Sequence, residues 1–349
     1  MDSQMKQAYI IISDVHLGSK TCNHKEFCHF LEWVRDLANQ PKTIKYGDKE
    51  ITIVSPEKII LLGDILELWD PKDGDRCNII TDFMRPFYLL SDIDCDKIYV
   101  LGNHDGSLSE LDGKINSKTL DEGTRFYIYD KCYPEKGEKT CLKVGNYSYV
   151  FIHGHQFDTL QAITQFVNRF WDPLGWFQEV FNIKFTKKHW QESLIIFLGL
   201  LIAGKYFFWN IFLQHSPYYI AIWAAVTCFY ALSSIPGIVA HSQMNVYSTM
   251  RPVDKTVEQV IKNGYYQKNK ETMDADVVVF GHTHFASSYE LKTDDDNKRF
   301  LNCGCWVGTD TNFDGKMRYT NSFIYLDETG SYILTWRGDG KIDCIEDFR

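Results

Sequence analysis

Residues 9–16 carry the sequence Tyr-Ile-Ile-Ile-Ser-Asp-Val-His, a short apolar run that ends in a serine, an aspartate and a histidine. Apolar runs of similar length recur at residues 58–62, 97–101, 147–152 and 276–280. Residues 24–39 instead place apolar side chains at the three- and four-residue steps of an amphipathic helix. Strand-length runs combined with such a helix predict a layered α/β protein.

Each apolar run is followed by a cluster of polar residues. The five clusters are Asp14-Val15-His16, Gly63-Asp64, Gly102-Asn103-His104-Asp105, His153-Gly154-His155 and Gly281-His282-Thr283-His284. Loops beyond strand ends are where ligands usually bind in layered sheets, and histidine with aspartate at this density suits a divalent transition metal. Asp14 and His16 are two residues apart at a strand end, so both can reach one ion. One such cluster alone is better explained as an ordinary surface or core feature, but five in one chain favour a metal site.

The order of these clusters, D-x-H, G-D, G-N-H-D, H-G-H and G-H-x-H, resembles that of the calcineurin-like metallophosphoesterase superfamily over residues 14–284. The resemblance implies an α+β fold, a two-sheet β-sandwich flanked by helices in α-β-β-α layers, with a dinuclear metal centre. One metal would be held by Asp14, His16, Asp64 and His284, and the other by Asp64, Asn103, His153 and His282, with Asp64 shared. The expected cofactors are two Mn ions, with Fe and Zn as alternatives because imidazole and carboxylate suit all three.

The same resemblance assigns catalytic roles beside the metals. Two divalent cations activate water and stabilise the charge of an in-line displacement at phosphorus. His104 occupies the position of a family histidine that contacts the phosphate or protonates the leaving oxygen, and Asp105 is expected to orient its imidazole. His155 is a lesser candidate for a supporting contact. These residues predict a metal-dependent hydrolase of phosphoester or pyrophosphate bonds.

Residues 159–250 differ from the rest of the chain, because long apolar stretches replace the strand-length runs. An aromatic-rich stripe at helical spacing covers residues 160–181 and predicts amphipathic helices. The flanking segments, 1–158 and 251–349, together have the size of one catalytic domain. We therefore expect a discontinuous metallophosphoesterase domain interrupted by a helical insertion.

Two apolar arms of the insertion, at about residues 194–213 and 218–240, are each long enough to span a bilayer core of about 30 Å. The short linker between them lacks Lys and Arg, whereas basic residues flank both outer ends. Since basic flanks remain cytoplasmic, the pattern predicts a multi-pass membrane protein, with a transmembrane hairpin and a cytoplasmic catalytic domain. The alternative is a helical pair buried in a soluble lid or a dimer interface, which Lys205, Asn210 and Pro236 favour.

A narrower resemblance, to UDP-2,3-diacylglucosamine hydrolases, rests on two further segments and on the insertion between the H-G and G-H-x-H motifs. The segments are Gly63-Asp64-Ile65-Leu66-Glu67-Leu68-Trp69 and Asn302-Cys303-Gly304-Cys305-Trp306-Val307. Enzymes of that branch cleave a nucleotide-lipid pyrophosphate at a membrane surface, which implies a phosphorylated lipid or nucleotide-lipid substrate here. That branch commonly has an arginine at the position of His104, so a related lipid-facing enzyme is favoured over that one substrate. The alternatives are a tethered phosphatase of soluble nucleotides or phosphoproteins, and a membrane scaffold.

Composition narrows the partners further. The 349-residue chain has 37 Lys and Arg against 46 Asp and Glu, a net charge of −9, so no nucleic-acid partner is expected.

The ten cysteines of the chain are scattered without a CxxC pair, which predicts reduced thiols. The close pair Cys303 and Cys305 is explained by packing at least as well as by metal binding. The polar N-terminal residues lead directly into the apolar run at residue 9, which predicts no signal peptide.

Overall fold

The computed structural model describes residues 7–68, 72, 77–109, 125–135, 141–157, 252–262, 274–292, 297–313 and 315–348, with residues 195–196, 198–203, 224–225 and 227–228 of the insertion. The chain divides into two compact units, one of Met1–Phe157 with Met250–Arg349 and one of Asp158–Thr249. The sheets and the labelled helices described below all belong to the first unit.

The larger sheet contains seven strands. They are β1 (Ala8–Ile12), β4 (Lys58–Leu62), β5 (Asp96–Val100), β6 (Phe126–Tyr129), β15 (Ser322–Asp327), β16 (Gly330–Trp336) and β17 (Ile342–Phe348). Their order across the sheet is β17-β16-β15-β1-β4-β5-β6. β1, β4, β5 and β6 run parallel, whereas β15 pairs with β1 in the antiparallel sense. The carboxyl ends of the parallel strands therefore lie at one edge of the sheet.

The smaller sheet has six strands. They are β7 (Cys132–Tyr133), β8 (Leu142–Val144), β9 (Tyr147–Ile152), β10 (Val277–Phe280), β11 (Ser287–Lys292) and β12 (Asn297–Asn302). The order is β11-β12-β10-β9-β7, and β8 also pairs with β9. β10 runs parallel to both β9 and β12, so the loops after these strands leave the sheet at the same edge.

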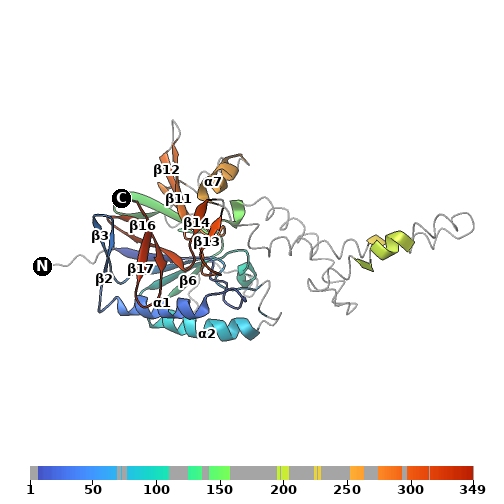
Figure 1. Cartoon of the computed structure of the whole chain (residues 1–349), viewed down its shortest axis with the longest axis horizontal. Coiled ribbons are helices and arrows are strands. Elements are labelled where there is room, and N and C mark those ends of the chain that lie inside the picture. The colour runs from blue at the N-terminus through green and yellow to red at the C-terminus, as the bar shows by residue number, and fades with distance from the viewer. Residues whose placement is uncertain are drawn as a thin grey trace, which may run out of the picture. The chain divides into compact units, whose positions relative to one another are not determined.

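Successive side chains of a strand point to opposite faces of its sheet, so the apolar residues of the two sheets form three separate layers. Ile11 and Ile60 face Val277 and Val279 in the cluster between the two sheets. The opposite face of the larger sheet packs on helices α1 (His24–Asp36) and α2 (Cys77–Asp92), which lie side by side in Figure 1. The outer face of the smaller sheet packs on helix α7 (Val253–Lys262). This is the α-β-β-α arrangement that the family resemblance implies.

Several elements have no counterpart in the sequence predictions. They are helix α2, strands β6, β7, β8 and β17, the hairpin of β2 (Lys42–Tyr46) and β3 (Lys49–Ile53), and the hairpin of β13 (Thr311–Phe313) and β14 (Lys316–Arg318). Helix α1 ends at Asp36, before the predicted boundary at residue 39, and helix α7 is described only as far as Lys262. These differences change the periphery of the sheets and leave the strand order at the polar clusters intact.

Within the ranges given above, no helix is long and apolar enough to cross a membrane. Most of the two arms predicted at residues 194–213 and 218–240 lies outside those ranges, as does the apolar stripe at 160–181. The transmembrane hairpin therefore receives no support from the described residues.

Candidate metal centre

All seven predicted metal ligands lie in loops that directly follow strands. Asp14 and His16 follow β1, Asp64 follows β4, Asn103 follows β5, His153 follows β9, and His282 and His284 follow β10. Main-chain hydrogen bonds join these loops within each sheet, from Asp14 N to Gly63 O at 3.1 Å and from Gly281 N to His153 O at 2.9 Å. The fold thus brings residues that are up to 270 positions apart in the sequence to one place (284 − 14 = 270).

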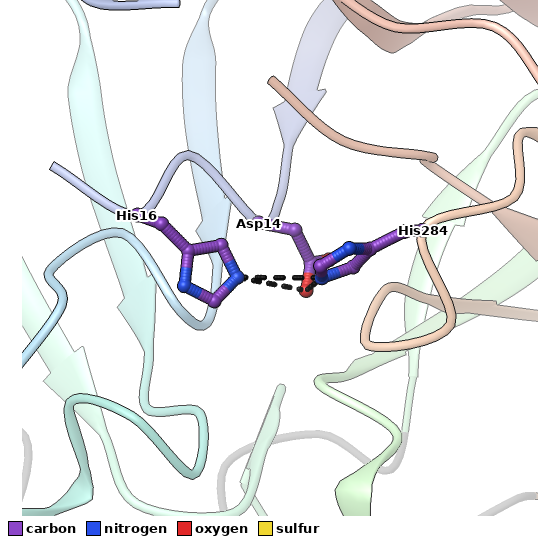
Figure 2. A group of neighbouring side chains, drawn as sticks. All are labelled: Asp14, His16 and His284. Carbon is purple, nitrogen blue, oxygen red and sulfur yellow. Dashed lines mark hydrogen bonds and ion pairs between the residues drawn. The ribbon is translucent and has the colours of Figure 1, made fainter. Parts of the chain in front are cut away.

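Figure 2 shows the first donor group, which consists of Asp14, His16 and His284. Nε2 of His284 lies 3.0 Å from Oδ1 of Asp14 and 3.3 Å from Nε2 of His16. All three side chains are buried. Oδ2 of Asp14 accepts hydrogen bonds from the Ser13 hydroxyl and from the main-chain N–H of His282, the latter at 2.8 Å. The remaining oxygen, Oδ1, therefore faces the two histidine rings.

The second donor group consists of Asp64, His153 and His282, with ligand atoms within 4.8 Å of one another. Nε2 of His153 lies 3.1 Å from Oδ2 of Asp64 and 3.2 Å from Oδ1 of Asn103. The other oxygen of Asp64 accepts a hydrogen bond from the main-chain N–H of His104 at 2.8 Å. Asp64 thus belongs to the second group, and its predicted role as a ligand shared by both metals stays a prediction.

The backbone at the donor groups is strained. Positive φ angles between 52° and 65° occur at Asp14, His16, Asp64, His282 and His284. These are five of the eight non-glycine residues with positive φ in the described part of the chain. Such conformations cost of order 1 kcal/mol or more for each residue and gather at functional sites. The main chain at Gly102 also lies close to the Asp64 carboxylate, and a Cβ atom at this position would overlap that carboxylate.

Glu67 connects the catalytic candidate His104 to the metal ligand His16. The buried Glu67 carboxylate bonds to Nδ1 of His104 through Oε1 at 2.8 Å and to Nδ1 of His16 through Oε2 at 2.9 Å. Burial opposes a charge on His104, but the carboxylates of Glu67 and Asp64 outweigh it and raise the pKa of His104 to about 9. The raised pKa favours the protonated ring, which is the form that a general acid needs.

Asp105 follows His104 directly, but its carboxylate makes other contacts. It accepts hydrogen bonds from the main-chain N–H of Ile65 at 2.9 Å, the main-chain N–H of Gly102 at 2.6 Å and the Tyr99 hydroxyl at 2.7 Å. These bonds tie the loop after β4 to the loop after β5. Since Nδ1 of His104 meets Glu67, the contact predicted for Asp105 is made by Glu67. No role was predicted for Glu67, although a carboxylate within an apolar run after the G-D motif is a signal of one.

The loops, donor groups and carboxylate–imidazole network all lie within the span of one family profile. The profile of the calcineurin-like phosphoesterases matches residues 9–286. The chain belongs to the calcineurin-like phosphoesterase family. Together with the buried His/Asp groups, this membership makes it a metal-dependent phosphoesterase. No curated protein matches the chain.

The donors of this calcineurin-like phosphoesterase fit divalent cations. Nδ1 of His153 donates to Leu62 O at 2.9 Å and Nδ1 of His16 donates to Glu67, which directs the Nε2 lone pair of each ring toward the other donors. Converging nitrogen and oxygen lone pairs need a positive charge between them. Although burial acts against it, Asp64 raises the pKa of His153 to about 10, so a proton holds the place that a cation would take. Burial lowers the pKa of His284 to about 4, which leaves that ring neutral and ready to bind metal.

The remaining candidates have smaller roles at the centre. The His155 ring lies beside the second group, 5.5 Å from the ring centroid of His153 and 6.4 Å from that of His282. Burial and these two histidines hold the pKa of His155 well below its ordinary value. Cys303 and Cys305 are both buried with raised thiol pKa values, and neither belongs to a donor group among the described residues. The packing interpretation of this pair therefore holds better than metal binding.

Proposed function

We propose that this phosphoesterase uses two divalent cations, Mn by preference, to hydrolyse a phosphoester or pyrophosphate bond of a lipid-linked or nucleotide-lipid substrate at the cytoplasmic face of a membrane. The observation that carries the hydrolytic part is the pair of donor groups, joined by the hydrogen bond from His282 N–H to Asp14. Cations bound there supply a nucleophile from water at neutral pH and neutralise charge on the phosphoryl group. Asn103 adds an amide oxygen to the second group.

His104 is proposed to protonate the leaving oxygen. Glu67 orients the ring through Nδ1, so Nε2 is the atom that delivers the proton. The side chain is 13 % exposed, more than any member of the first donor group, which suits a residue that meets an entering phosphate. Because its pKa is raised, the ring regains a proton from water after each turnover.

The lipid part of the proposal rests on the insertion. The helical residues described there present five large apolar side chains to solvent, at Ile195, Ile196, Leu198, Leu201 and Ile202. Ile195 and Ile202 are each 68 % exposed, and a soluble surface rarely gathers such residues on one short segment. An acyl chain or a bilayer would cover them. We therefore favour a substrate related to that of the UDP-2,3-diacylglucosamine hydrolases, on an enzyme held at the membrane.

The reaction class and the substrate are tested together by purified full-length protein with added Mn²⁺. UDP-2,3-diacylglucosamine, a generic phosphodiester and a generic monoester are offered separately, with Asp64→Ala as the inactive control. We expect hydrolysis that Asp64→Ala abolishes and a preference for the acylated pyrophosphate. Equal catalytic efficiency on an acylated substrate and on its headgroup would favour the soluble-substrate phosphatase, and inactivity of a folded, metal-loaded protein on all of them would favour the scaffold.

Membrane attachment is tested by deleting residues 190–245 and by the double change Ile195→Glu with Ile202→Glu. The matched control is Ile80→Glu on helix α2, because Ile80 is 63 % exposed but lies in the catalytic unit. We expect the deletion to release the protein from membranes and the double variant to weaken vesicle binding, with the control unchanged. A deleted protein that still fractionates with membranes contradicts attachment through the insertion.

A further inference from the structure

Arg318 is a buried cation close to the first donor group. It is the last residue of β14 and is only 3 % exposed. No ion pair joins its guanidinium to a carboxylate of the residues that the structure describes. Buried arginines are usually paired with an acid, because an unpaired charge is costly to take out of water. The hydrogen bonds that the guanidinium makes must therefore compensate for the loss of water around its charge.

Four neutral acceptors surround the guanidinium. Nε donates to His284 O at 3.1 Å, Nη1 to Thr309 O at 3.2 Å, and Nη2 to Cys305 Sγ at 2.8 Å and to Val307 O at 3.0 Å. Three of these acceptors lie in the segment 305–309, and the fourth is the main-chain carbonyl of a predicted metal ligand. A planar group with five fixed donors can hold such a set, whereas an ammonium cannot.

The segment that Arg318 holds also reaches the other side of the first donor group. Trp306 lies between two of the residues bound by Nη2, and its main-chain N–H donates to Asp14 O at 3.0 Å. The chain of contacts therefore runs from His284 O through Arg318 to the 305–309 segment and on to Asp14 O. These two carbonyls belong to the residues whose side chains face each other at 3.0 Å.

Both ends of this connection have strained backbones. His284 has a φ of 55° and Asp14 a φ of 54°, a region that few residues other than glycine adopt. A hydrogen bond to the carbonyl of each residue limits rotation of the peptide that carries the donor side chain. Holding these two peptides fixes the direction in which the imidazole and the carboxylate point.

We propose that Arg318 is a positioning residue of the metal centre. It fixes the placement of His284 relative to Asp14 by bonding directly to the main chain of His284 and, through the 305–309 segment, to that of Asp14. The proposal rests on the metal centre proposed above. It predicts that loss of the guanidinium weakens one of two metal sites more than it weakens the fold.

The test compares Co²⁺ binding by full-length wild type, Arg318→Lys and Arg318→Met after removal of metal with a chelator. Visible absorption of bound Co²⁺ reports ligand geometry, titration reports affinity at each site, and thermal unfolding with and without Co²⁺ reports the stabilisation that binding supplies. The control is Arg299→Met, because Arg299 is a partly buried arginine of β12 that pairs with Glu290 away from the donor groups. A milder variant, Cys305→Ala, removes the sulfur acceptor of Nη2 together with the weak contact from Sγ to Val307 O at 3.8 Å.

We expect Arg318→Lys and Arg318→Met to lower Co²⁺ affinity at one site at least tenfold, to change the absorption spectrum and to reduce the metal-induced rise in Tm. Arg299→Met should stay within twofold of wild type, and Cys305→Ala should lose about two- to threefold. A purely structural role would instead lower the Tm of the metal-depleted protein and leave affinity and spectrum unchanged, which would overturn the proposal. If neither Arg318 variant folds, unchanged Co²⁺ binding in Cys305→Ala overturns it. Failure of wild type to bind Co²⁺ would overturn the metal centre itself.

Discussion

Replacing Glu67 by glutamine tests proton donation by His104, because the change removes one charge and keeps the shape of the side chain. The Glu67 carboxylate is the strongest of the influences that raise the pKa of His104 from 6.5 to about 9, against the effect of burial. Without that charge, only the Asp64 and Asp105 carboxylates oppose the effect of burial, so the pKa falls toward the ordinary histidine value of 6.5. A group with a pKa of about 9 is about 97 % protonated at pH 7.5 and one with a pKa of 6.5 about 9 %, so the protonated fraction falls by up to about tenfold. Bound cations lower the pKa in both proteins, so the difference between them is the quantity to measure.

The assay compares two phosphate esters, one with a p-nitrophenyl leaving group and one with an alkyl leaving group. An alkoxide needs a proton to depart, whereas p-nitrophenolate leaves without one. In Glu67→Gln we expect kcat for the alkyl ester to fall by up to about tenfold and kcat for the p-nitrophenyl ester to fall less than about threefold. Glu50→Gln is the control, because Glu50 is an exposed residue of β3 whose partner is Lys45 at 3.6 Å. Equal losses on both esters would refute the reasoning and place the effect of Glu67 at the metal ligand His16.

Three further outcomes are expected. Asp64→Asn should reduce the number of bound metals, counted by elemental analysis. It should also lower the rate of hydrolysis by about a thousandfold or more, since activation of water depends on the cations. Retention of two metals would contradict the second donor group. Metal affinity should fall about tenfold for each unit that pH drops below about 10, because a cation must displace the proton that the raised pKa of about 10 keeps on His153. Competition titrations at pH 6 and pH 8 that give the same affinity would argue against this ligand. Phe30→Ala should lower the free energy of unfolding by about 3–5 kcal/mol in denaturant titrations, because Phe30 is fully buried against Trp306, Phe323 and Trp336. A loss under about 1 kcal/mol would contradict that packing.

The donor groups could be predicted because the chemistry is local at each strand end. Asp14 and His16 follow an uninterrupted apolar strand, and the same combination recurs after β4, β5, β9 and β10. Parallel strands bring their carboxyl ends together, so residues far apart in the sequence meet without any long-range signal of their own. The sequence pattern therefore locates the site even where it does not give the contacts.

The contacts behind the donors could not be predicted, because they depend on distances between separate loops. Glu67 is 51 residues from His16 and 37 residues from His104, so its place in an apolar run can indicate a role but not the two histidines that it contacts. The resemblance leads us to expect Asp105 to orient the next residue back, His104, yet the Asp105 carboxylate accepts hydrogen bonds from the main chain of two loops. Arg318 lies on a three-residue strand that has no recognisable pattern. Sequence adjacency is a poor guide to which acid meets which base in a loop-built site.

Helix α2 was missed for a local reason. Pro86 lies inside it, and proline is a strong indication against helix because it removes one main-chain hydrogen bond and crowds the preceding turn. Packing on α1 and the larger sheet overrides that preference, with Leu89 and Leu90 buried in the shared core. Tertiary contacts thus decide an element that residue preferences alone would reject.

The junction of the insertion has a consequence for how this fold can diversify. Phe157, before the insertion, and Val253, after it, are buried in the same apolar cluster under the smaller sheet. The Phe157 ring packs on Phe280, with ring centroids 5.5 Å apart, so the departing chain is anchored to the strand that precedes His282. A segment whose two ends enter one cluster can be lengthened, shortened or exchanged without disturbing strand pairing. Evolution can therefore vary the inserted module while the loops that carry the donor groups are inherited unchanged.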